Sequence, residues 1–76
     1  MKRLQKVPLV EIAGENRVLV ENHLGVIAYS TERIQIKVSY GKLAVSGTQL
    51  RLMQLSGEQL VITGNVDMVE LIRREK

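Results

Sequence analysis

The sequence predicts an all-β domain, a small antiparallel β-sandwich made of short strands that glycine-containing turns connect. Three apolar runs share the pattern apolar–x–apolar–x–Gly, and a second run soon follows each of them: residues 10–14, 43–47 and 60–64. Valine and isoleucine together number sixteen, while phenylalanine and tryptophan are absent. Stiff β-branched side chains suit a pleated surface better than a helix. The chain is therefore expected to form strand–turn–strand units around an aliphatic core.

The first half of the chain is expected to contain three short strands. The first covers residues 10–13 and ends in a turn at residues 14–16, and the second covers residues 17–21. Residues 22–25 form the next turn, because the side chain of an asparagine can bond the backbone and glycine accepts unusual dihedral angles. The third strand follows at residues 26–30.

The clearest strand signal is the strict alternation of apolar and polar residues over residues 34–40. Such alternation buries one face of a strand, and Tyr40 falls on the buried face, at the core or its rim. Gly41 and Lys42 are then expected to form a two-residue hairpin turn into a strand at residues 43–47.

Three further apolar runs predict strands, at residues 50–55, 60–63 and 66–72. Residues 56–59 are the expected hairpin link between the first two. The last run could instead belong to a short helix over residues 66–75, because its apolar residues are spaced by three, but a strand to about residue 72 is favoured. Several runs are apolar on both faces. One face of such a strand can enter the core, and a second layer or another copy of the chain must cover the other face.

An imperfect internal repeat leaves a β-solenoid as the alternative fold. The pattern of residues 43–47 recurs at residues 60–64, an offset of 17, which is compatible with stacked coils. Two-residue glycine turns join antiparallel neighbours, whereas parallel neighbours need longer connections, and this favours the antiparallel fold.

Charge divides the chain into one β domain at residues 8–72 and two basic tails at residues 1–7 and 73–76. The net charge is +3, but six of the eleven basic residues lie in the tails. The body holds five basic and seven acidic residues and is therefore about −2. Nucleic-acid binding, which needs a basic face on the folded body, is not favoured. The absence of cysteine favours a cytoplasmic location, and no apolar run approaches the roughly 20 residues of a transmembrane helix.

No enzyme, cofactor or metal site is expected from the sequence. His23 is the only histidine and Asp67 the only aspartate, and no Gly-x-Ser-x-Gly motif presents a nucleophile. One histidine without any cysteine does not make a zinc site, and the glycines are spread singly rather than in a phosphate loop. Glu11 and Glu21 are interpreted as surface charges. The expected role of His23 is structural, within the turn at residues 22–25, and contact with a partner is the functional alternative.

Residues 18–30, V-L-V-E-N-H-L-G-V-I-A-Y-S, resemble the YabP/YqfC family of sporulation proteins from spore-forming Firmicutes. The resemblance covers roughly residues 8–72, and its Glu-Asn-His-x-Gly piece is similar to the YqfC branch. It implies a small cytoplasmic protein made in the mother cell during endospore formation, with an immunoglobulin-like β-sandwich and no catalytic residues. It also implies a neighbouring membrane-associated sporulation protein, YqfD.

The favoured hypothesis is a non-enzymatic binding or scaffold module that associates through a sheet edge or face, with itself or with a membrane-associated partner of the YqfD type. The protein could then be peripheral to the membrane. The candidate partner-binding residues are Asn22, His23, Gly25 and Tyr29. Two alternatives remain. One is a self-assembling structural β protein. The other is a small regulatory nucleic-acid binder that uses the basic tails together with the cations of the body, Arg17, Arg33, Lys37 and Arg51.

Overall fold

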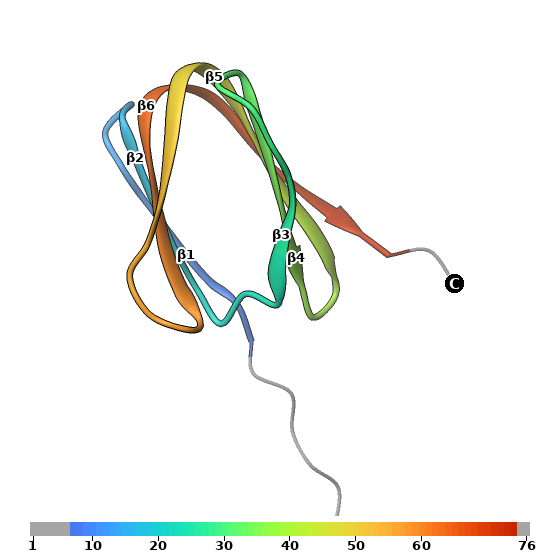
Figure 1. Cartoon of the computed structure of the whole chain (residues 1–76). Helices are drawn as coiled ribbons and strands as arrows, with labels where there is room; N and C mark the ends of the chain where they lie inside the picture. The colour runs from blue at the N-terminus through green and yellow to red at the C-terminus, as the bar shows by residue number, and fades with distance from the viewer. Residues whose placement is uncertain (1–6, 75–76) are drawn as a thin grey trace, which may run out of the picture.

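The computed structural model describes residues 7–74, which form a six-stranded β-sheet without any helix (Figure 1). The strands are β1 (Leu9–Ala13), β2 (Arg17–Glu21), β3 (Gly25–Tyr29), β4 (Arg33–Val38), β5 (Gly41–Gln54) and β6 (Gln59–Arg73). Their order in the sheet is β1-β2-β6-β5-β4-β3, and all five pairings are antiparallel. The all-β antiparallel prediction is confirmed, and the solenoid alternative is wrong because its coils would stack in parallel. The strands belong to one sheet rather than to two separate sheets.

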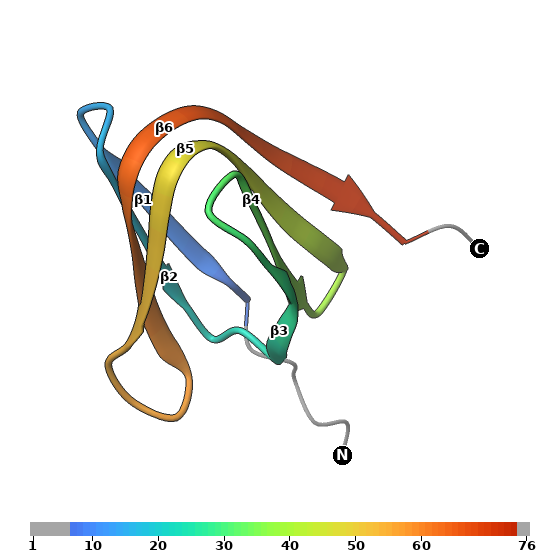
Figure 2. The same ribbon diagram turned by 45° about the horizontal axis from the view of Figure 1, so that its top comes forward.

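The sheet is bent into two arms because its two longest strands run through a corner. β5 has 14 residues and β6 has 15, and Figure 2 shows both arching over from one arm to the other. The first arm consists of β1, β2 and the strand segments 59–63 and 51–54. The second arm consists of β3, β4 and the strand segments 41–46 and 66–73.

Two glycines that the sequence assigns to turns lie at this corner instead. A Cβ on Gly47 would overlap the carbonyl oxygen of Asn65, and a Cβ on Gly64 would overlap that of Gln49. The register of β5 against β6 shifts at the same place, through bulges that bend both strands. The expected separate strands at residues 43–47 and 50–55 are therefore one strand, and those at residues 60–63 and 66–72 are another. The glycines permit close backbone contact at a bend rather than reversal of the chain.

The core fills the space between the arms. Ten buried aliphatic residues form it, namely Val18, Val20, Ile34, Ile36, Val38, Leu43, Val45, Leu50, Leu60 and Ile62. They alternate along their strands with residues of the outer face, as a sheet with one buried side requires. Tyr40 packs against this cluster, as predicted.

The hairpin between β4 and β5 turns two residues earlier than expected. Gly41 already pairs with Val38 and with Arg73, so the turn consists of Ser39 and Tyr40 rather than Gly41 and Lys42. A shift of two residues keeps the same side chains on the buried face, and the alternation in the sequence therefore could not locate the turn.

The C-terminal run is a strand as far as Arg73, which confirms the predicted strand and rules out the helix. Most of the two basic tails, residues 1–6 and 75–76, lies outside the described residues. Between residues 7 and 74 there is no helix long and apolar enough to cross a membrane.

Candidate partner-binding site

The segment that joins β2 to β3 ties the open ends of the two arms together. The backbone N–H groups of Asn22 and His23 both donate to the carbonyl oxygen of Glu58, at 2.7 and 3.3 Å. Glu58 belongs to the loop at the end of the first arm. The N–H of Leu24 donates to the carbonyl oxygen of Lys37, at 2.7 Å, on the second arm. This segment therefore fixes the spacing of the arms at the end opposite the corner.

His23 lies inside this connection and is only 7% exposed. Its Nδ1 accepts a hydrogen bond from the N–H of Gly25 at 3.0 Å, and its Nε2 lies 3.1 Å from the side-chain amide nitrogen of Gln54. That amide also donates to the carbonyl oxygen of Ser56. A buried polar ring is stable only when its nitrogens have partners, and these contacts supply them. The geometry matches the structural role expected of His23, whereas its contact with a partner stays a prediction.

Asn22 is half-buried and adopts a left-handed conformation with φ of +65°. Asparagine tolerates this region better than most residues, which explains why the chain carries it at the end of β2. Its side-chain amide donates to the carbonyl oxygen of Val7 at 2.9 Å. Asn22 therefore helps to hold the chain that precedes β1.

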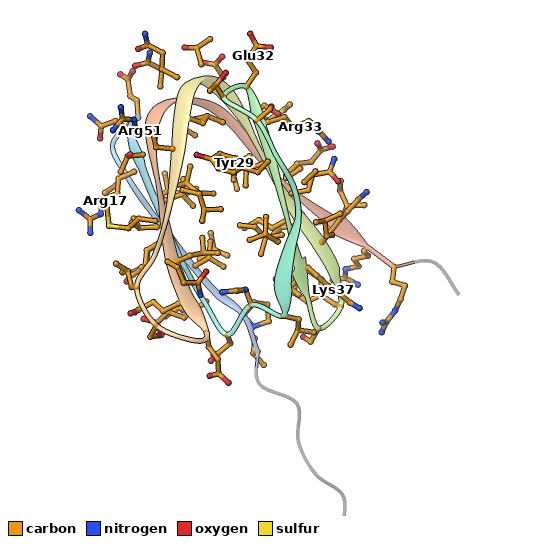
Figure 3. The ribbon with its side chains drawn as sticks, viewed as in Figure 1. Arg17, Tyr29, Glu32, Arg33, Lys37 and Arg51 are labelled. Atoms are coloured by element: carbon orange, nitrogen blue, oxygen red, sulfur yellow. The ribbon has the colours of Figure 1, made fainter. Side chains whose placement is uncertain are left out.

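Tyr29 lies at the other end of β3 from the remaining three candidate residues. Its hydroxyl oxygen accepts a hydrogen bond from the backbone N–H of Leu52 at 3.4 Å. Figure 3 shows the ring directed from the second arm into the space between the arms. The structure thus brings Asn22, His23 and Gly25 together at the open end and places Tyr29 apart from them. Tyr29 remains exposed beyond this contact.

The longest free strand edge belongs to the C-terminal half of β6. β2 pairs only with residues 59–63, and the N–H of Val66 donates to the carbonyl oxygen of Glu15 in the β1–β2 turn at 2.8 Å, so residues 67–73 have β5 on one side and no strand on the other. The N–H of Arg74 donates to the carbonyl oxygen of Tyr40 at 2.8 Å, which sets the alternation of the antiparallel ladder. The N–H and C=O groups of Val69, Leu71 and Arg73 consequently point away from β5.

Exposed apolar side chains accompany this free edge. Leu71 is 58% exposed on the inner face, and Met68 is exposed on the outer face. A depression of about 430 Å³ lies beside Leu71, lined by Tyr40, Leu71 and Arg73. The sequence carried only a partial signal for this site, the run at residues 68–69 that is apolar on both faces. The sequence could not show that β2 pairs with β6 only as far as residue 63 and leaves the rest of that edge of β6 open.

The other edge of the long hairpin is covered. The N–H groups of Leu50 and Leu52, on the free side of β5, donate to the carbonyl oxygen of Thr31 and to the hydroxyl of Tyr29. Proteins commonly protect strand edges in this way, since an open edge can pair with another chain. The contrast makes the uncovered edge of β6 the stronger candidate for strand addition.

Side chains suited to metal binding are not gathered in the described part of the chain. No group of three or more His, Cys, Asp or Glu residues between residues 7 and 74 could hold a metal ion.

Comparison with known proteins places the chain in a family. The model of the YabP family matches residues 5–76. The chain belongs to the YabP family. Within the same comparison, the uncharacterized protein YqfC of Bacillus subtilis is 20% identical over 69 residues, which covers 91% of this chain and 74% of YqfC. The resemblance to the YabP/YqfC family seen in the sequence is thereby confirmed. No solved structure matches the chain significantly.

Proposed function

We propose that this member of the YabP family is a non-enzymatic sporulation protein that acts as a small binding or scaffold module in the mother-cell cytoplasm during endospore formation. Its partner is a membrane-associated sporulation protein of the YqfD type. The family membership supports the biological setting. The free edge of β6 is the observation that carries the binding role.

Binding by this edge would extend the sheet by one strand from the partner. Three N–H and three C=O groups, those of Val69, Leu71 and Arg73, are oriented to form the new backbone hydrogen bonds. Main-chain bonds of this kind provide affinity, and the side chains beside them provide specificity. The partner would cover Leu71 on the inner face and Met68 on the outer face, both of which are exposed. In this proposal the bent sheet functions as a sandwich-like support for the edge.

The test is a Leu71→Lys variant, because a lysine beside the edge opposes strand addition. Met53→Lys is the matched control, since Met53 is an equally exposed apolar residue on the outer face of the first arm. Leu71 is exposed, and we expect both variants to change stability by no more than about 0.5 kcal/mol. Circular dichroism checks that they fold.

Binding to the detergent-solubilised partner is then measured by co-purification and titration. We expect Leu71→Lys to weaken binding at least tenfold, a loss of about 1.4 kcal/mol, and Met53→Lys to leave it within a factor of two. Equal affinity for Leu71→Lys and the unmodified protein would exclude the β6 edge. Absence of any binding to the YqfD-type protein would exclude this partner. Self-association seen by light scattering, and abolished by Leu71→Lys, would instead assign the edge to a second copy of the chain.

A further inference from the structure

The outer faces of the two arms differ in charge. On the second arm, the outward positions of β4 and β5 hold Arg33, Lys37 and Lys42, and the adjoining part of β6 holds Glu70, with Asp67 at the bulge near the corner. On the first arm, the outward positions hold two acids and two bases, namely Glu11, Glu21, Arg17 and Arg51. Figure 3 shows Arg33 and Lys37 on one arm and Arg17 and Arg51 on the other. The first face is therefore neutral and the second is basic.

The basic charge of the second arm is concentrated at the β4–β5 turn. Lys37 lies directly opposite Lys42 in the ladder. The carbonyl oxygen of Lys37 accepts a hydrogen bond from the N–H of Leu24, so the N–H and C=O groups of Lys37 point toward β3 and away from β5. The two lysines therefore form a non-hydrogen-bonded pair, in which Cα atoms are only about 4.5 Å apart and side chains are close. Like charges placed directly opposite each other destabilise a sheet.

The positions directly beside this lysine pair carry no charge, and the nearest acid of the face, Glu70, lies diagonally from Lys42. The next positions across the sheet are Gly25 beside Lys37 and Ile72 beside Lys42. Arg74 adds a third cation, and its guanidinium donates to the carbonyl oxygen of Ser39 in the same turn at 3.4 Å. Arg33, by contrast, lies at the other end of the face and donates to the hydroxyl of Ser46 at 3.1 Å. The excess of positive charge thus lies at Lys37, Lys42 and Arg74, three cations against the one carboxylate of Glu70, and we call these three residues the basic end.

An exposed apolar side chain lies next to the basic end. Leu24 is 60% exposed, and its backbone is bonded to Lys37. Cations combined with a protruding apolar side chain are typical of surfaces that bind the interface of an anionic bilayer. Neither tyrosine presents a fully exposed ring there, since Tyr29 is on the inner face and Tyr40, although it belongs to the β4–β5 turn, is half-buried against the core. The basic end therefore lacks the aromatic platform that stacks bases of single-stranded nucleic acid.

We propose that the basic end binds an anionic phospholipid surface, with Lys37, Lys42 and Arg74 at the headgroups and Leu24 at the apolar boundary. This extends the proposed function, since lipid contact would hold the protein beside its membrane-associated partner. The free edge of β6 would remain available for that partner, because Leu71 lies on the inner face and the lysines on the outer face. The lipid test nevertheless needs no partner protein, so lipid binding by the basic end and partner binding by the β6 edge can each be refuted without the other.

The experiment is co-sedimentation of the full chain with vesicles rich in phosphatidylglycerol and with vesicles of phosphatidylcholine alone. The test variant is Lys37→Gln/Lys42→Gln. The control is Arg17→Gln/Arg51→Gln, which removes the same charge from the outer face of the first arm, where the two arginines flank Thr63. Both variants keep identical tails and net charge, so any difference between them reports the position of the cations.

We expect binding to phosphatidylglycerol only, weakening as salt screens the charges. Each cation near an anionic surface contributes about fivefold to partitioning, so the lysine variant should bind about 25-fold more weakly. The arginine variant should bind the same vesicles no more than about threefold more weakly than the unmodified protein. An equal loss in both variants, or no binding at low salt, would overturn the proposal. Binding of short DNA or RNA through the same lysines, without binding of vesicles, would overturn it in favour of a nucleic-acid ligand.

Discussion

Replacement of Gly47 by alanine tests the close contact at the corner of the sheet. The added methyl group would overlap the carbonyl oxygen of Asn65 and would lie 2.9 Å from the carbonyl carbon of Asn65 and 3.2 Å from the nitrogen of Asp67. These atoms belong to backbone, so no flexible side chain can move aside. To relieve the overlap, β5 and β6 must separate at the paired positions 47–66 and 48–65.

The expected cost of this change follows from two contributions. Overpacking typically costs about 1–3 kcal/mol, and the loss of one or two backbone hydrogen bonds costs about 1 kcal/mol each. The sum is about 2–5 kcal/mol, against a total stability of about 4–11 kcal/mol for a chain of this length. Since about 1 kcal/mol shifts the midpoint of a small domain by about 4–8 °C, Gly47→Ala should lower Tm by about 8 °C or more.

Thermal unfolding followed by circular dichroism measures this effect, with Gly57→Ala as the control. Gly57 lies exposed in the β5–β6 loop, and a Cβ there would have no neighbour within 4 Å. Its replacement should change stability by no more than about 0.5 kcal/mol. If Gly47→Ala unfolds within about 3 °C of the unmodified protein, the strands do not meet at the corner as described, since even 1 kcal/mol would be visible.

Two further predictions concern the contacts that join the arms. His23→Leu should destabilise the fold by about 1–3 kcal/mol in urea unfolding, because the part-buried N–H of Gly25 loses its partner and the amide of Gln54 loses one of its contacts. An unchanged midpoint would show that the ring does not bridge them. Tyr29→Phe should cost less than about 1 kcal/mol, since the lost bond is long and partly exposed, but it should speed hydrogen exchange at Leu52. Unchanged exchange at Leu52 would contradict the contact between the arms.

Much of the local structure could be predicted because it depends on short-range pattern. The alternation over residues 34–40 identifies a half-buried strand, and the first two strands were located to within one residue. The errors arose where one residue type serves two purposes. Gly47 and Gly64 end apolar runs, as turn glycines do, but they lie where two backbones touch. Which purpose applies depends on a strand that is distant in the sequence.

The candidate sites show the same limit. The distinctive segment at residues 22–25 was recognised from its residue types, but its hydrogen bonds to Glu58 and Lys37 join positions that are far apart in the chain. The open edge of β6 was not predicted at all, because an edge is defined by a missing neighbour. The basic end was also hidden, since Lys37 and Lys42 become adjacent only through the register of β4 against β5.

The sequence by itself determined the all-β class, the aliphatic core, the family and most strand positions, because β-branched content and period-two alternation act between near neighbours. Only the tertiary structure decided that one sheet bends into two arms, that the C-terminal half of β6 keeps an open edge, and that the basic charge gathers on one outer face. These features depend on pairing between segments as distant as β2 and β6, and burial of apolar surface selects that pairing for the whole chain at once.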